Sequence, residues 1–182
     1  ALDESFNPGT GANGAIFDVA VQSDGKIVIV GAFTQFNGVA RNRVARLNTD
    51  GTLDTSFNVG TGPNATVECV ALQTVGAEVR VVIGGQFGAV SGSTRSGVAR
   101  LLTTGAVDTT FNNGGTGTNG IVRCVAVDSL DRVLIGGDFT TYRDIANTHV
   151  RSRIARLNSN GALETAFAAN ANGTVRAIVV QT

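Results

Sequence analysis

The sequence predicts an all-β protein built from repeated sheets, and two observations support this. The first is that the chain of 182 residues aligns with itself. A Leu-Asp-like pair recurs, with a Phe three residues after each acid, at Leu2-Asp3, Leu53-Asp54, Val107-Asp108 and Leu163-Glu164. The second is that the Val- and Ile-rich runs are short and end at Gly, Asn or Asp. No stretch keeps a helical period long enough for a helix, so we expect almost none.

Two further columns define the repeat. A Gly-x-Phe motif recurs at residues 31–33, 85–87 and 137–139, and a Val-Ala-Arg-Leu motif recurs at 44–47, 98–101 and 154–157. A period of about 54 residues is typical of β-propeller blades or solenoid coils. We expect three full β-propeller blades and a partial blade at each end. The expected boundaries are 1–8 for the end of a preceding blade, 9–58, 59–112 and 113–168 for the blades, and 169–182 for the first strand of a next blade.

Each blade is predicted to be a four-stranded antiparallel up-and-down sheet. The expected first strands are 16–22, 67–73, 122–128 and 175–181, the second strands are 26–33, 79–87 and 132–139, the third strands are 43–48, 97–102 and 153–158, and the fourth is a short strand of the 52–57 type. Glycine weakens a strand unless something packs closely against it. The glycines of the second strands therefore predict close packing, with a Phe of a neighbouring blade as the expected contact.

The lengths of the connections predict that the two ends of the blades form two different faces. Ser23-Asp24-Gly25 and Asp50-Gly51 are tight turns, whereas the connections at 34–42 and 58–65 are long. Alternate connections of an up-and-down sheet lie at the same end. Both long loops should therefore share one face, and we expect binding there, because loops on a rigid scaffold carry function.

Composition excludes some partners. Lys plus Arg equals Asp plus Glu at 14 each, and charged residues make up 15% of the chain. This balance removes the electrostatic reason to expect nucleic acid. No apolar run approaches the ~20 residues that span a bilayer, so we expect no membrane insertion. All basic residues except Lys26 are Arg, which favours ordered ion pairs. Cys69 and Cys124 occupy equivalent positions and are expected to be small buried hydrophobes.

The repeat motifs resemble the delta-60 repeat family. They are Leu53-Asp54-Thr55-Ser56-Phe57-Asn58, Gly9-Thr10-Gly11-Ala12-Asn13-Gly14, Val19-Ala20-Val21-Gln22-Ser23-Asp24-Gly25-Lys26, Gly31-Ala32-Phe33 and Arg46-Leu47-Asn48-Thr49-Asp50-Gly51. The resemblance covers almost the whole chain. It implies β-propeller blades in large bacterial surface or secreted proteins, and it carries no catalytic motif. The second repeat departs most, at 73–77 and 102–105.

Recurring charged residues are predicted to have a structural role. The third strands carry an Arg and the fourth strands an acid that a tight hairpin brings together: Arg46 with Asp54, Arg100 with Asp108, and Arg156 with Glu164. The alternative is a ring of anion-binding arginines, but a pair present in every blade favours an internal ion pair.

The third-to-fourth turns also suggest calcium. Asn48-x-Asp50-Gly51-x-x-Asp54 resembles half of a calcium loop, but it has too few carboxylates and no final bidentate Glu. We expect ordinary turns, with no metal and no cofactor.

The candidate binding residues lie in the predicted long loops. They are Asn37, Arg41, Asn64, Tyr142, Arg143, Asp144 and His149. Tyr and Arg are typical recognition residues. No Ser/His/Asp or Cys/His set recurs, so we expect no enzyme.

The sequence thus predicts a non-enzymatic interaction module, extracellular or on the bacterial cell surface, that binds a protein or a glycan through the long-loop face. Two alternatives stay open: an accessory domain of a secreted enzyme with its catalytic residues elsewhere, and a component that self-assembles with other copies. Because both ends cut through a repeat, we expect a fragment of a larger protein.

Overall fold

The computed structural model describes residues 5–181 and confirms the all-β prediction, because these residues form strands and turns and no helix. Within the same range, no helix is long and apolar enough to span a membrane. The expected start of the preceding-blade segment, residues 1–4, lies outside the described residues.

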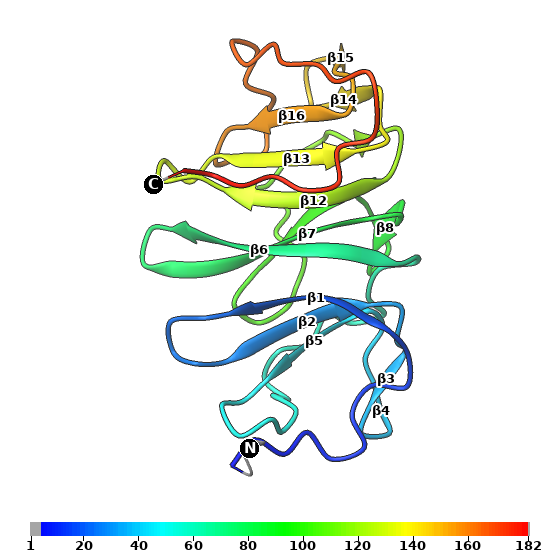
Figure 1. Ribbon diagram of the computed structural model, residues 1–182, viewed down its shortest axis with the longest axis vertical. Coiled ribbons are helices and arrows are strands. Elements are labelled where there is room, and N and C mark those ends of the chain that lie inside the picture. The colour runs from blue at the N-terminus through cyan, green and yellow to red at the C-terminus, as the bar shows by residue number, and fades with distance from the viewer. Residues whose placement is uncertain (1–4, 182) are drawn as a thin grey trace.

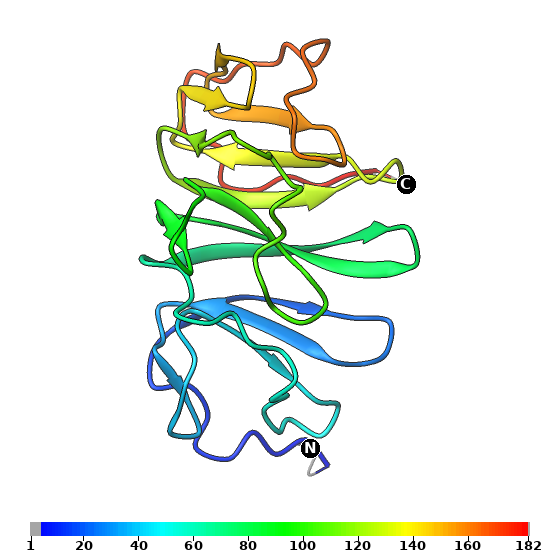
Figure 2. The same cartoon turned by 180° about the vertical axis from the view of Figure 1, so that it is seen from behind.

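Three antiparallel sheets stack along the long axis of the molecule (Figures 1 and 2). We refer to them as blades 1, 2 and 3. Blade 1 contains β1 (Ile16–Val21), β2 (Ile27–Gly31) and β5 (Val44–Leu47); blade 2 contains β6 (Val67–Val75), β7 (Glu78–Gly85) and β10 (Val98–Leu101); blade 3 contains β12 (Val122–Val127), β13 (Val133–Gly137) and β16 (Ile154–Leu157). In each blade the first strand pairs with the second, and the second pairs with the third.

The predicted fourth strand is reduced to one bridge per blade. These bridges join Leu47 to Leu53, Leu101 to Val107 and Leu157 to Leu163. The chain turns away immediately afterwards, because the Asp54 carboxylate accepts hydrogen bonds from the backbone N–H and hydroxyl of Ser56. The four-stranded expectation is therefore wrong in detail: the regular sheets have three strands, and the following Phe enters the space between blades.

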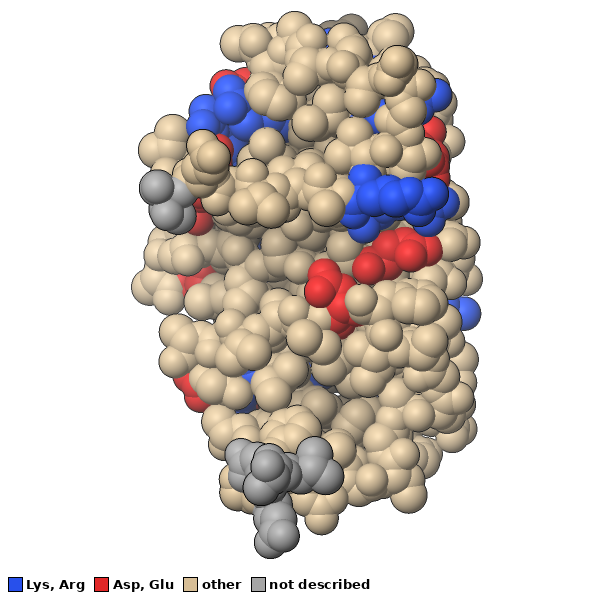
Figure 3. Space-filling view, viewed as in Figure 1, with Lys and Arg blue, Asp and Glu red and all other residues tan. Residues whose placement is uncertain are grey.

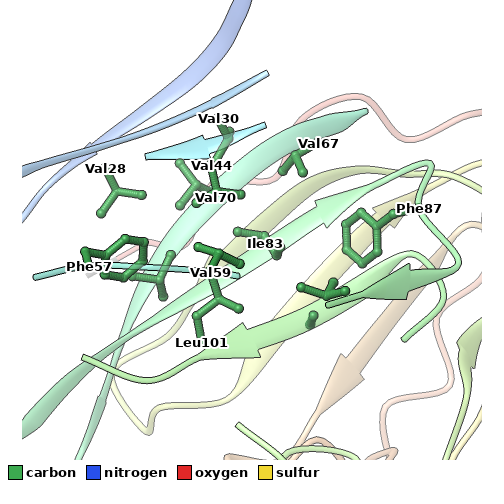
Figure 4. Close-up of a cluster of buried hydrophobic side chains, with 13 residues drawn as sticks. Val28, Val30, Val44, Phe57, Val59, Val67, Val70, Ile83, Phe87 and Leu101 are labelled. Carbon is green, nitrogen blue, oxygen red and sulfur yellow. The ribbon is translucent and has the colours of Figure 1, made fainter. Parts of the chain in front are cut away.

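That space is filled by a continuous apolar core. Figure 4 shows Phe57 beside Val28 of blade 1 and Val59 of the connection to blade 2. The cluster continues through Ile83 and Leu101 of blade 2, and all five residues are at most 5% exposed. Blades of this kind cover each other's faces, which explains why their middle strands are apolar without alternation. Each blade is therefore stabilised by its neighbour.

Three of the second-strand glycines have a different cause from the one we expected. A Cβ atom on Gly85 would lie 2.3 Å from the carbonyl oxygen of Thr66, on the first strand's side of the same blade. Gly31 and Gly137 face the equivalent carbonyls at 2.0 Å. The register of each first strand shifts at this point, so its backbone comes close to the second strand. At these three glycines the close neighbour is this carbonyl. Gly84 and Gly136 do face the next blade or segment, but the neighbour is a Val and not a Phe: Val122 at 2.7 Å and Val175 at 2.6 Å.

The predicted long loops contain small hairpins of their own. They are β3 (Gln35–Phe36) with β4 (Val39–Ala40), β8 (Ala89–Val90) with β9 (Ser93–Thr94), and β14 (Thr141–Arg143) with β15 (Thr148–Val150), where β14 also pairs with β11 (Gly117–Thr118). The sequence reading missed them because two- and three-residue strands leave no periodic pattern.

The expected first strand at 175–181 is extended but forms no regular strand. It runs beside β12 in both views (Figures 1 and 2). A Cβ atom placed on Gly136 would lie 2.6 Å from Cγ1 of Val175. Each of the other first strands forms a hydrogen-bonded ladder with the second strand of its own blade. Segment 175–181 forms no such ladder among residues 5–181. It stacks on blade 3, where the N–H of Val175 donates to the Gly137 carbonyl at 3.3 Å.

Both cysteines are free and buried. Burial raises the pKa of the Cys69 thiol well above its ordinary value and that of Cys124 to about 11. Because the thiolate is the reactive form, both thiols are unreactive near neutral pH and act as packing groups between blades.

Candidate functional site

The two predicted faces are present. The first-to-second hairpins reach one side of the stack, and the small hairpins β3–β4, β8–β9 and β14–β15 reach the other (Figure 1). We call the second side the long-loop face and the first the tight-turn face. The segment that enters each blade lies against that blade's small hairpin: the N–H of Ser91, for example, donates to the Gly62 carbonyl at 2.9 Å.

An asparagine holds each long loop in place. Asn64 accepts hydrogen bonds through Oδ1 from the backbone N–H groups of Gly88 and Ala89, at 3.0 and 3.1 Å. Asn13 and Asn119 make the same pair of bonds in blades 1 and 3. Asn64, a predicted binding residue, therefore uses its oxygen to fix the scaffold, which satisfies two loop donors. The face is built as a set of clamped loops.

Two other predicted binding residues also make internal bonds. Asn37 accepts through Oδ1 from the Thr10 hydroxyl at 3.0 Å and from the Gly11 N–H at 2.9 Å. Arg41 is half-buried and donates from Nη1 to the carbonyl oxygen of Ala40 at 2.8 Å. These side chains tie the loop of blade 1 to itself and to the segment that enters the blade.

Tyr142 does not present its ring to a ligand. It is fully buried, and its hydroxyl donates to the Gly161 carbonyl at 2.6 Å. Burial raises the pKa of Tyr142 far above its ordinary value. The expectation of an exposed recognition tyrosine is wrong because β14 turns this residue inward, into the core between blades 2 and 3. The ring serves as the base on which the hairpin rests.

Asp144 and His149 form a pair inside the same hairpin. Asp144 is 7% exposed, and its Oδ2 lies 3.0 Å from Nε2 of His149. Its Oδ1 accepts from the N–H groups of Ala146 and Asn147. Burial would raise the pKa of Asp144, but these N–H groups and that of Leu163 outweigh it and hold the pKa below its ordinary value. The pair shapes the connection between β14 and β15.

The exposed surface of this hairpin includes two aliphatic side chains and an arginine. Arg143 is exposed, and the side chains of Ile145 and Val150 are 69% and 71% exposed. The sequence reading chose Arg143 but missed the two aliphatic residues. An apolar residue inside an otherwise polar loop is the sequence feature that could have indicated that these residues are exposed. We call Arg143, Ile145 and Val150 the hairpin patch.

The recurring arginines and acids form ion pairs inside the blades. The Arg Nε lies 2.8 Å from the carboxylate in the Arg46–Asp54 pair, 2.9 Å in Arg100–Asp108 and 2.6 Å in Arg156–Glu164. Each guanidinium also lies over a ring of its own repeat, Phe57, Phe111 or Phe167, at 4.6–4.7 Å from the ring centre. A second cation reaches each acid: Lys26 for Asp54, Arg80 for Asp108 and Arg132 for Glu164.

These arginines also join one blade to the next. Nη1 of Arg46 donates to the carbonyl of Thr103 in blade 2 at 3.0 Å, and Nη1 of Arg100 donates to the carbonyl of Ser159 in blade 3. Burial would raise the pKa of Asp108, but bonds from Thr110 and Arg100 keep it below its ordinary value. With their donors committed, Arg46 and Arg100 are not open to an external anion.

The turns considered for calcium hold their oxygens internally. Oδ1 of Asp50 accepts from the N–H and the hydroxyl of Thr52, at 2.9 and 2.6 Å, and Oδ1 of Asn160 accepts from the N–H of Ala162 at 3.0 Å. Among residues 5–181, no three His, Cys, Asp or Glu side chains are grouped so that they could hold a metal ion.

The charged surface side chains are dispersed. On the side of the molecule that carries β1, β6 and β12, they form small groups of both signs on a largely uncharged surface (Figure 3). Such a surface has no strong field of one sign.

A family model described as "Domain of unknown function (DUF5122) beta-propeller" matches residues 22–57, 80–111 and 131–167, which together make more than half of the chain. One match falls in each repeat, and this confirms the family resemblance drawn from the motifs. No curated protein matches the chain.

Proposed function

Because the chain belongs to the DUF5122 beta-propeller family, a domain family of unknown function, we propose that it is a non-enzymatic interaction module of a bacterial secreted or cell-surface protein. It binds a partner through the long-loop face, and the hairpin patch is the centre of that contact. The observation that carries the proposal is the exposure of Ile145 and Val150 on a loop whose base is fixed by the buried Tyr142. Exposed apolar residues that gather into a patch mark interaction sites, and we propose that Ile145 and Val150 belong to such a patch.

The composition of the patch favours a protein partner over a glycan. Aliphatic side chains next to an Arg suit the apolar centre and polar rim of a protein interface. Glycan sites usually offer an aromatic ring for stacking, and the only Tyr of the chain is buried. The long-loop face also needs no rearrangement before binding, which lowers the entropic cost of association.

Binding should depend on the hairpin patch and not on the opposite face. The double variant Ile145→Asp/Val150→Asp is expected to weaken binding at least about tenfold, because it places charges at the centre of an apolar contact. Leu130→Asp is the control: Leu130 is 66% exposed but lies in a first-to-second turn on the tight-turn face. The measurement is binding of the labelled chain to arrays of purified extracellular proteins and of glycans. Equal losses in both variants, or binding to glycan spots alone, would contradict the proposal.

Self-association is a second candidate, favoured by an uncovered sheet face. Ile16, Val19 and Val21 of β1 are 44–63% exposed, whereas the equivalent Val67 and Val70 of β6 are buried against blade 1. If copies assemble through this face, light scattering over a range of concentrations shows a mass that rises to a multimer, and Val19→Lys abolishes the rise. A concentration-independent monomer excludes this candidate.

A further inference from the structure

The junction between blades 2 and 3 is closed on the tight-turn face by one glutamine. Gln73 is fully buried, and its Nε2 donates to the carbonyls of Asp131 and Ser159, at 2.6 and 3.3 Å. Its Oε1 accepts from Nη1 of Arg100 at 2.7 Å. Every polar atom of this amide therefore has a partner, and the junction is sealed by hydrogen bonds.

The equivalent glutamine between blades 1 and 2 is left unsatisfied. Gln22 is 8% exposed, and its Oε1 is buried without a hydrogen-bond partner among the described residues. The arginine of the same blade makes the difference. Nη1 of Arg100 donates both to Oε1 of Gln73 and to the Ser159 carbonyl, whereas Nη1 of the equivalent Arg46 donates to the Thr103 carbonyl and not to Gln22. A buried amide oxygen without a partner is costly and requires an explanation.

A cavity of about 340 Å³ opens at this point. Its polar lining consists of Gln22, Ser23, Asp24, Arg46, Glu78 and Thr103. The volume falls within the range of about 300–1,000 Å³ that is usual for small-molecule sites. The lining comes from two blades, so the cavity belongs to the junction and not to a single turn.

The charges of the lining point to a neutral ligand. Arg46 is paired with Asp54, and Glu78 is paired with Arg80 at 2.6 Å. Asp54 is contacted by both Arg46 and Lys26, so these two cations balance Asp54 and Asp24 in number, although the Lys26 ammonium is paired with Asp54 and not with Asp24. What remains to bind a ligand is a set of amide, hydroxyl and carboxylate groups with more acceptors than donors. Such a lining matches a molecule that brings several hydroxyl donors.

We propose that the cavity between blades 1 and 2 binds a neutral, hydroxyl-rich small molecule of about monosaccharide size, which hydrogen-bonds to Gln22, Ser23 and Asp24. This site lies on the tight-turn face, opposite the hairpin patch. It does not depend on the interaction proposed above, and failure of either proposal leaves the other standing.

Titration of the ¹⁵N-labelled chain with D-glucose, D-galactose, D-mannose and myo-inositol tests the site, with methylammonium chloride and sodium phosphate as charged probes. At least one neutral probe is expected to give saturable shifts in the amide signals of Gln22, Ser23 and Asp24. Ser23→Ala should weaken that probe roughly three- to tenfold, the effect of one lost hydrogen bond. Ser129→Ala, the equivalent turn position in blade 3, is the matched control and should leave the affinity unchanged.

Three results would overturn the proposal. The first is the absence of saturable shifts with every neutral probe. The second is a response to methylammonium or phosphate alone. The third is an equal loss of affinity in the Ser23→Ala and Ser129→Ala variants. Both serines are exposed in turns, so neither substitution threatens folding, and unchanged thermal unfolding of the two variants verifies this.

Discussion

Replacing Arg100 with Met is expected to lower the free energy of unfolding by about 3 kcal/mol, because it removes one partner of a buried ion pair and leaves Asp108 with only its contact to the more exposed Arg80. Arg100 and Asp108 are each 3% exposed in their side chains. The substitution also removes the bonds to Gln73 and to the Ser159 carbonyl of blade 3, together with the contact over Phe111. Urea denaturation monitored by circular dichroism measures the loss.

Arg156→Met is the matched control for this substitution. Arg156 makes the same pair with Glu164, but both side chains are about one-fifth exposed, and no carbonyl of a following blade contacts Arg156 within residues 5–181. Solvent screens such a pair, so the loss should be much smaller than at Arg100. Similar losses for the two variants would show that the pair does not join blades.

Gly85→Ala is expected to destabilise the protein by about 2–3 kcal/mol, through overpacking. The added methyl would lie 2.3 Å from the Thr66 carbonyl oxygen and 2.9 Å from Cα of Val67, and neither backbone atom can move without disturbing the β6–β7 ladder. Thermal unfolding of the variant measures this loss.

Gly88→Ala provides the control three residues later. A Cβ on Gly88 meets no described atom within 4 Å, and the residue is exposed, so its substitution should change stability by about 0.5 kcal/mol or less. If Gly85→Ala is equally mild, the carbonyl contact does not explain the repeated glycine.

The features that the sequence predicts well are those that every repeat shares. The Gly-x-Phe motif, the Arg and acid columns and the unequal connections each occur three times, and so the fold class and the two faces can be read from them. The reduction of the fourth strand to a single bridge could not be predicted, because the turn at Asp54 depends on a side-chain bond to Ser56 that competes with strand pairing.

The candidate site was harder to predict, because it depends on which way single side chains point. Tyr142 looks like a recognition residue in sequence, but contacts with the core between blades 2 and 3 turn it inward. Asn37 and Asn64 look like free loop amides, yet both bond to backbone groups more than twenty residues away in sequence. The unsatisfied Gln22 depends on which acceptor Arg46 reaches in the next blade. Such long-range contacts leave no local pattern.

We propose that the long-loop face is a preformed platform for binding, and amide hydrogen exchange of the intact chain tests this proposal most directly. The N–H groups of Thr34, Gly88 and Thr140, which donate to the clamp asparagines, are predicted to exchange slowly. Exposed Gly173, whose N–H makes no hydrogen bond among residues 5–181, should exchange fast and serves as the internal reference. If the three clamped amides exchange as fast as Gly173, the loops are not held in place and the platform does not exist.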